Sequence, residues 1–430
     1  MGHHYPIGII SLFLLLVGQR LMTFRGAERG LPLLCDFFHL SWPCPTRWAG
    51  RWWWLRLGYY KLTRKLPRGD DWVWIIDHSI QIGPEKCLLI LGVRLRDLPS
   101  DNRCLSYEQV EPLTLYPVRQ STGEIVYQQL EETQPRTGPP TEILTDQGSD
   151  RRAGVGQYSR AHPTTRPVAD IAHLAALLLK HELHNDASWQ SFVNYATAIR
   201  HELQQTPQAA LIPPNQRSKA RYMNLEPLLR WGRQLIAWWE HPEPLADYGL
   251  DPEAMRARLW GLHHWKTPLD EWETLWQLAQ TTVARVRHEG YFRGVEQVLE
   301  PQLALPYSTE RTQRMRQSLL EGVAREGQKA HPDERLIGSS EIIESVFGAL
   351  KALEGPYAGR GFTGLLLSAA AMVSTTTEEV IRNALETVPT KEVRQWLAEK
   401  LGTSFQAQRQ AIFKSTPKAE QKSDQLSDVA

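Results

Sequence analysis

The chain contains 430 residues, 42% of them hydrophobic and 23% charged, which is the composition of a soluble globular protein. It is too long for one simple core, so we expect two or three folding units. The net charge of +1 hides an asymmetry, because residues 1–70 carry +7 and the remainder −6. A basic first segment ahead of a mildly acidic body indicates an anion-binding module joined to a unit with carboxylate chemistry.

The cysteines argue against two common stabilising devices. They form no C-x-x-C pair, and no histidine lies at zinc-finger spacing from them. We therefore expect neither structural zinc nor a disulfide framework. A cytoplasmic location, where thiols stay reduced, fits this pattern. The four are Cys35, Cys44, Cys87 and Cys104.

The first element in chain order is the apolar run Ile7–Val17. It is about a dozen residues long, which is short of the ~20 residues needed to cross a bilayer. It also lacks a cationic leading region and a small-residue cleavage site, so it does not match a signal peptide. We expect a buried helix here and no membrane association.

The basic segment then has the outline of a helix-turn-helix. A helical stretch over 23–38 is followed by a proline-containing break over 41–45 and a second helix over 46–58. Arg47 and Arg51 lie four residues apart near the start of the second helix, where a recognition helix meets DNA. Trp48, Trp52 and Leu55 would supply its core side. The alternative is a small helical domain with a basic solvent-facing surface.

The pattern changes to strands after a basic linker at 61–71. A β-rich run over 72–77 ends in an acid, and a weaker run over 114–118 contains a proline. We expect residues 133–140 to be a loop, because they contain three prolines and a glycine. The remaining expected elements are a hairpin turn over 79–85, strands over 87–94, 142–146 and 166–170, and a helix beginning near Ser149.

From residue 181 to about 333 the sequence has a helical pattern, and a helix carrying Glu344 follows. The apolar residues of that helix recur at i, i+3, i+4 and i+7, which predicts one buried stripe. Glu344, Gly348 and Lys351 stand beside the stripe, with the glycine leaving room for a bulky ligand. Taken alone, the pattern is also that of an ordinary amphipathic helix with one exposed ion pair. The stripe consists of Ile343, Val346, Phe347 and Leu350.

Asp77, Asp146 and Glu344 form the candidate catalytic set. Each aspartate alone could simply cap a turn, but two acids at strand ends and one on a later helix can share one site. Two Mg²⁺ ions about 3.5–4 Å apart promote phosphodiester cleavage, and this hard ion prefers carboxylate oxygens. We expect Asp77 to bridge both ions, with Asp146 and Glu344 each completing one site.

On these residues the sequence resembles a DDE transposase of a bacterial insertion sequence. The resemblance rests on residues 74–79, 143–148, 170–173 and 340–351, and on the six residues that separate Glu344 from Lys351. It implies an α/β, ribonuclease-H-like mixed sheet with a large helical insertion, preceded by the helix-turn-helix. It also implies Mg²⁺, replaceable by Mn²⁺, DNA partners at the element's terminal repeats and at the target, and a homo-oligomer.

The domain boundaries expected from this resemblance follow the changes of pattern. The chain would contain a helical DNA-binding domain (1–66), a first part of the catalytic core (67–180), a helical insertion (181–333), a second part of the core (334–414) and a disordered tail (415–430).

The chain departs from the compact members of the family in the distance from Asp146 to Glu344, which is 198 positions in the sequence. Glu341 competes with Glu344 as the third acid, and Asp150 competes weakly with Asp146. Lys351 would contact the phosphate of the terminal nucleotide.

Two alternatives to a transposase remain open on sequence grounds. One is a ribonuclease-H-like nuclease without strand transfer, and the other is a transposase-derived DNA-binding protein that has lost catalysis. A separate question concerns His173, which either lines the site or, as we favour, belongs to the core.

Overall fold

A computed structural model describes residues 5–78, 86–146, 148–215, 224–241, 259–354 and 364–401, together with Tyr222, Asp251, Glu253, Arg256, Ile412 and Phe413. The first helices are α1 (Ile7–Gly18), α2 (Phe24–Phe37) and α3 (Arg47–Thr63). The sheet region contains β1 (Trp72–His78), β2 (Lys86–Arg94), β3 (Glu111–Val118), α4 (Gly123–Thr137), β4 (Glu142–Thr145), α5 (Ser149–Ala161) and β5 (Arg166–Ala169).

The rest of the described chain is helical. The long segment after the sheet contains α6 (Ile171–Leu183), α7 (Ala187–Leu203), α8 (Glu226–Glu240), α10 (Lys266–Glu289), α11 (Val295–Leu299) and α12 (Glu310–Gly327). The chain then returns to the sheet with α13 (Glu341–Glu354), followed by α14 (Ser368–Met372), α15 (Glu378–Thr387) and α16 (Thr390–Leu401).

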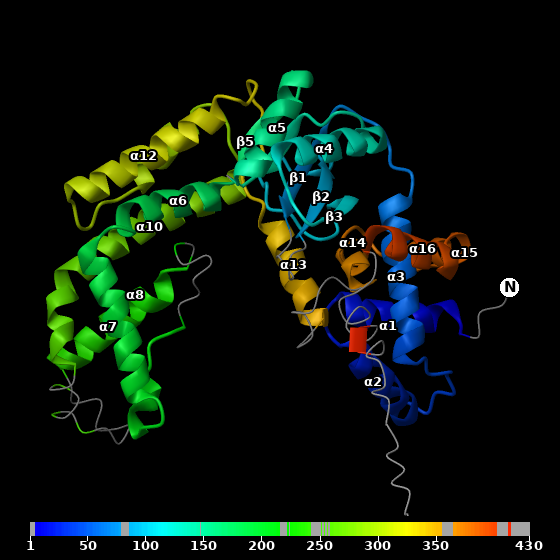
Figure 1. Ribbon diagram of the computed structural model, residues 1–430, viewed down its shortest axis with the longest axis horizontal. Helices are drawn as coiled ribbons and strands as arrows, with labels where there is room; N and C mark the ends of the chain where they lie inside the picture. The colour runs from blue at the N-terminus through cyan, green and yellow to red at the C-terminus, as the bar shows by residue number, and fades with distance from the viewer. Residues whose placement is uncertain are drawn as a thin grey trace, which may run out of the picture.

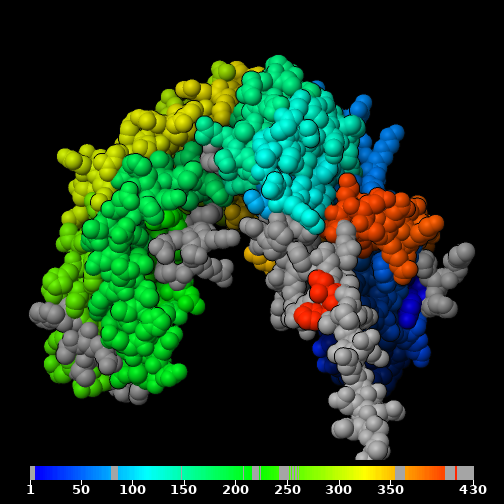
Figure 2. Space-filling view, viewed as in Figure 1, coloured from blue at the N-terminus to red at the C-terminus, as the bar shows by residue number. Residues whose placement is uncertain are grey.

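These elements form an arch with the sheet at its top (Figure 1). Helices α7, α8 and α10 make one side of the arch, while α1–α3 and α13–α16 make the other. The space-filling view shows an open hollow between the two sides (Figure 2). The helical insertion therefore projects away from the sheet and leaves open the space between α13 and helices α7, α8 and α10.

The five strands form one mixed sheet in the order β3-β2-β1-β4-β5. Strand β1 is central, antiparallel to β2 and parallel to β4, and β4 is parallel to β5. The expected mixed sheet is present. The architecture is mixed α/β and consistent with a ribonuclease-H-like fold.

Alternate residues of β1 enter two different cores, as the two-residue period of a strand requires. Trp72, Trp74 and Ile76 pack against α4 and α5, whereas Val73 and Ile75 face the core shared with α6 and α13. Asp77 has the same parity as Val73 and Ile75, so the sheet directs it toward the face that α13 covers.

The first and last helices of the chain share one hydrophobic cluster. Residues of α1, α2 and α3 pack in it with residues of α14 and α15. The side chain of Lys61, on α3, is completely buried and donates to the carbonyl oxygens of Val373 at 2.6 Å and Ser374 at 2.9 Å. The expected burial of the apolar run Ile7–Val17 is confirmed in α1.

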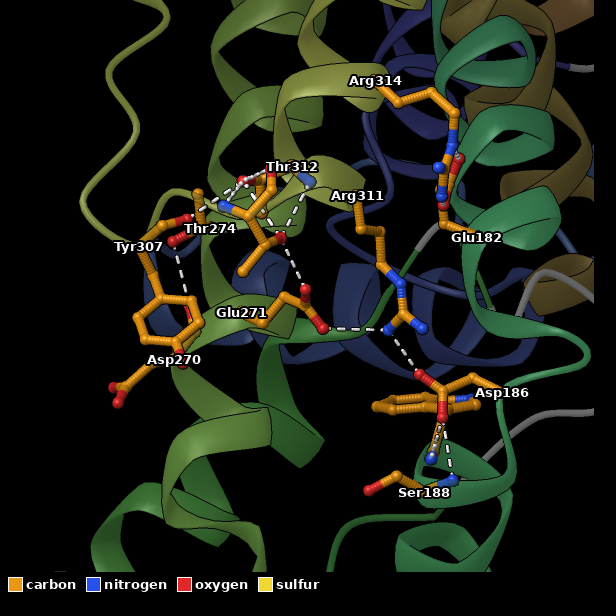
Figure 3. A network of polar contacts seen from close by, with 12 residues as sticks. Glu182, Asp186, Ser188, Asp270, Glu271, Thr274, Tyr307, Arg311, Thr312 and Arg314 are labelled. Carbon is orange, nitrogen blue, oxygen red and sulfur yellow. Dashed lines mark hydrogen bonds and ion pairs between the residues drawn. The ribbon is translucent and has the colours of Figure 1, made fainter.

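The insertion is held together by an aromatic core and by a partly buried polar network. Arg311 of α12 lies between Asp186 and Glu271, 2.5 Å and 2.9 Å from their carboxylate oxygens (Figure 3). Asp186 also caps the start of α7, so one guanidinium joins α7, α10 and α12. The aromatic core includes Trp189, Phe192, Trp231, Trp265 and Trp272.

Two expectations about these elements are wrong. Residues 133–137 are the last part of α4 and not a loop, because the helix starts at a Thr122 cap and buries Val126 and Leu130 at helical spacing. Pro135 lies in the last turn, so the one backbone hydrogen bond that it cannot donate is lost at the end of the helix and the preceding turns stay intact. Trp48 does not belong to the core, since it is 59% exposed, while Trp53 and Trp54 are buried.

Several expectations lie outside the described residues, namely the turn over 79–85 and the tail over 415–430. Among the helices that the structure describes, none is long and apolar enough to span a bilayer.

Candidate functional site

Three aspartates form a row across the ends of β1, β4 and β5. The parallel registers pair Ile76 with Thr145, and Thr145 with Ala169. The next residue of each strand is an acid, so Asp77, Asp146 and Asp170 occupy neighbouring positions on one face. Adjacent parallel strands are about 4.8 Å apart, which brings these carboxylates close together.

Arg151, in the first turn of α5, joins the first two of these aspartates. Its guanidinium donates from Nε to Oδ1 of Asp146 and from Nη2 to Oδ2 of the same carboxylate. Its Nη1 lies 3.6 Å from Oδ1 of Asp77 and donates to Nδ1 of His78 at 2.6 Å. The guanidinium is thus a cation placed between two strand-end carboxylates.

Burial and neighbouring charges together set the pKa of the Asp77 carboxyl. Burial raises the pKa of this carboxyl to about 7, the charge of Arg151 opposes the rise, and the charge of Asp146 adds to it. One guanidinium shared between two acids therefore leaves Asp77 with incomplete compensation. Burial, together with the charge of Arg151, lowers the pKa of His78 to about 4, so its Nδ1 accepts as a neutral imidazole.

His173 lies between the second and third acids, which overturns the expectation of a core histidine. Its Nε2 is 3.5 Å from Oδ2 of Asp146, its Nδ1 is 3.7 Å from Oδ1 of Asp170, and its side chain is 31% exposed. The neighbouring carboxylate of Asp170 raises the pKa of His173, burial opposes this, and the charges of Asp146 and Asp77 favour the protonated form.

Asp170 fixes the start of the helix that carries the third expected acid. Its Oδ1 caps α6 by accepting from the His173 backbone, and its Oδ2 accepts from the backbone and the hydroxyl of Ser340. Burial works to raise the pKa of Asp170, but these hydrogen bonds lower it overall. Both oxygens of this carboxylate therefore have structural partners.

Helix α13, which carries Glu344, contacts β1. The expected stripe is confirmed, with Ile343, Val346, Phe347 and Leu350 buried. Partial desolvation raises the pKa of Glu344, and the negative charges of Asp170 and Asp146 raise it further, while His173 lowers it. Glu344 is thus within electrostatic reach of the row.

The polar face of α13 has the clearance that the sequence predicts. Gly348 and Lys351 are exposed on the same side as Glu344, and a Cβ at Gly348 would meet nothing within 4 Å.

The two competing acids have other partners. Glu341 forms an ion pair with Arg287 of α10. Asp150 lies 3.6 Å from Nδ1 of His78, on α5 and not at a strand end. Neither is part of the row of aspartates, and the choice of Glu344 over Glu341 stays a prediction.

The carboxylates fit a hard divalent cation in their chemistry, since Mg²⁺ prefers such oxygens. Their placement does not provide one, because no three His, Cys, Asp or Glu side chains within the described ranges are arranged to hold a metal ion. The guanidinium of Arg151 is the cation that Asp77 and Asp146 share. The metal-ligand assignment of Asp77, Asp146 and Glu344 therefore stays a prediction.

The two residues expected to bind DNA lie at the start of α3. Arg47 stacks over the exposed Trp48, with 5.6 Å from its guanidinium carbon to the ring centroid, and Arg51 is half-buried. Nine residues connect α2 to α3, more than the three or four of a simple helix-turn-helix. Most of α3 is buried against other helices, so only its first turns are open to a partner.

Comparison with known proteins assigns no family to this chain. No protein-family model and no curated protein matches the chain. Among solved structures, the Drosophila P element transposase strand transfer complex is similar, with 11% identity over 89% of this chain and 94% of that chain. The TM-score is 0.41, and similarity at this level does not define function.

Sequence reasoning did not identify the roles of three residues of the site. Nothing in the sequence marked Arg151 as a site residue, because an arginine in the first turn of a helix is usually exposed to solvent. Asp170 and His173 stood out only as a short D-x-x-H stretch, and the strand register was needed to place Asp170 beside Asp146.

Proposed function

We propose that this chain is a DNA transposase of the DDE type, related to those of bacterial insertion sequences. It would cleave the ends of a DNA element and join the resulting 3′-hydroxyl groups to target DNA. The observation that carries this proposal is the row of strand-end aspartates on the face that α13 covers with Glu344.

The proposed chemistry assigns a role to each acid. Asp77, Asp146 and Glu344 would hold Mg²⁺, or Mn²⁺ in its place. The ions supply activation of the attacking hydroxyl and stabilisation of the leaving oxygen when bound. Asp170 and Ser340 would position α13, so that Glu344 stays near the two aspartates.

The DNA would lie along the open side of α13. Lys351 shares the exposed face of that helix with Glu344 and would contact a backbone phosphate near the reacting bond. Gly348 leaves space for the strand between them. Arg47 and Arg51 would bind duplex DNA at a second place, the start of α3.

A plasmid cleavage assay tests this function directly. The substrate carries the DNA that flanks the gene on both sides, and the products are followed with Mg²⁺, with Mn²⁺ and with chelator. We expect metal-dependent nicks at fixed positions and joined target products. Cleavage without joining would support a nuclease instead.

The alternative of a DNA-binding protein without catalysis has one observation in its favour. Arg151 already neutralises Asp146 and approaches Asp77, and a permanently arginine-bound pair could not bind metal. Specific binding to the flanking DNA with no cleavage under any metal condition would support this alternative.

A further inference from the structure

The side chain of Arg151 lies inside the candidate site. The inference drawn from it below rests on the proposed function in one respect, namely that the metal ion bound there is Mg²⁺ or Mn²⁺. The Arg151 side chain is 13% exposed, and each of its three guanidinium nitrogens has a partner. The fork matches the two oxygens of Asp146, the geometry in which arginine binds a carboxylate most strongly. Arg151 is therefore a component of the site and not a solvated surface residue.

The chain makes room for this guanidinium at Gly148. A Cβ at that position would lie 2.3 Å from Nη2 and 2.8 Å from Cζ of Arg151. The backbone does not require glycine there, because φ is −58° and ψ is 134°, values that any residue adopts. What glycine provides at this position is space for the arginine side chain.

A divalent cation and this guanidinium compete for the same oxygens. Both oxygens of Asp146 accept from Arg151, and the guanidinium lies on the side that faces Asp77. A metal ion shared by the two aspartates would need these oxygens at about 2.1 Å. Two cations at such a separation repel strongly, so only one of them occupies the place at a time.

We propose that Arg151 is a displaceable internal cation, which bridges Asp77 and Asp146 in the metal-free protein and leaves when a divalent ion binds. The resting protein thereby avoids two uncompensated, closely spaced carboxylates. Metal binding is weakened by the hydrogen bonds that the arginine must give up, and the site becomes competent only after the side chain has moved.

Metal affinity of the full chain, measured by calorimetric titration with Mn²⁺ and Ca²⁺, tests this directly. Arg151→Ala should bind either ion roughly tenfold or more tightly than the wild type, because no charge-assisted hydrogen bonds compete. Gly148→Ala should tighten binding in the same direction, since it expels the guanidinium and keeps every charged group. Arg152→Ala, which removes the exposed neighbouring arginine, should leave the affinity unchanged.

Thermal melting of the same variants provides the second measurement. Arg151→Ala should melt below the wild type without metal and show a larger rise in Tm when metal is added. Gly148→Ala keeps the test usable if Arg151→Ala fails to fold.

The possible results separate this inference from the proposed function. Equal or weaker metal binding by both Arg151→Ala and Gly148→Ala overturns the inference, even if the wild type cleaves DNA. Tighter binding without DNA cleavage supports the inference and contradicts the transposase. No metal binding by any variant contradicts both.

Discussion

Ser340 donates both its backbone N–H and its hydroxyl to one oxygen of Asp170, at 2.7 and 2.9 Å. These bonds tie the beginning of α13 to the end of β5, across a sequence separation of 170. The insertion can therefore be long without loosening the site, since the helix that carries Glu344 is attached directly to the sheet.

This attachment predicts unequal effects of two substitutions. Asp170→Ala removes the cap of α6 and leaves the buried donors of Ser340 without an acceptor, so we expect a loss of roughly 2–4 kcal/mol in the free energy of unfolding. Ser340→Ala removes only the hydroxyl and should cost about 1 kcal/mol. Urea denaturation measures both, and equal losses would contradict the attachment.

The proposed catalytic set predicts a pattern of lost activity. Asp77→Asn, Asp146→Asn and Glu344→Gln should each lower the cleavage rate by on the order of a thousandfold, equivalent to about 4 kcal/mol of transition-state stabilisation, while DNA binding persists. Glu341→Gln is the matched control, because Glu341 pairs with Arg287. Activity retained in Glu344→Gln but lost in Glu341→Gln would reverse the assignment.

If Arg47 and Arg51 at the start of α3 bind DNA phosphates, the affinity for DNA should depend on salt concentration. The double variant Arg47→Ala, Arg51→Ala removes two cations, so the slope of log affinity against log salt should decrease by about 2. Arg382→Ala, at an exposed residue paired with Glu378 on α15, serves as the control and should bind like the wild type. Binding unchanged in the double variant would exclude this surface.

Replacing Lys61, which lies far from the candidate site, should lower the free energy of unfolding by a large amount. Lys61→Met leaves the carbonyl oxygens of Ala371, Val373 and Ser374 without their shared donor, and we expect a loss of roughly 3 kcal/mol. Lys65→Met, four residues on and exposed, should change stability by less than about 0.5 kcal/mol. Chemical denaturation of the two variants provides the comparison.

The buried carboxyl of Glu142 should make the stability of the protein depend on pH. Burial raises the pKa of this carboxyl from 4.5 to about 8, although the backbone N–H of Ile337 donates to it at 3.2 Å. Between these values the folded chain holds a proton that the unfolded chain has lost, so stability falls as the pH rises from 4.5 to about 8.

Glu142→Gln removes that dependence. It should resemble the wild type near pH 4.5 and be more stable above pH 8, by on the order of 2–4 kcal/mol. The control is Glu321→Gln, at an exposed position, whose difference from the wild type should stay constant across this range. Melting curves at several pH values measure these differences. A stability difference between Glu142→Gln and the wild type that does not change with pH would show that burial of this carboxyl does not control the pH dependence.

Local patterns were sufficient for most of the secondary structure. The β1 run, the apolar stripe of α13 and the apolar first helix follow from periodicity alone, because each buries one face or all faces of a regular element. The error at residues 133–137 came from treating prolines as loop markers, although one proline near a helix end is tolerated.

The site was predictable only in part. Asp77 and Asp146 could be placed at strand ends from their sequence context, but their pairing with Arg151 depends on the turn between β4 and α5. The role of Asp170 depends on the register of β5 against β4 and on contact with Ser340. Such relationships join distant parts of the chain and leave no periodic signal.

The burial of Lys61 has a consequence for synthesis of the protein. Its carbonyl partners lie as many as 313 residues later in the chain, and the cluster that covers α3 includes residues of α14 and α15. A nascent chain on the ribosome cannot complete this cluster until its last helices have emerged. Products that terminate before α14 would expose the apolar face of α3, which favours aggregation and proteolysis. The helical domain that carries Arg47 and Arg51 therefore becomes stable only after α14 and α15 have been synthesised.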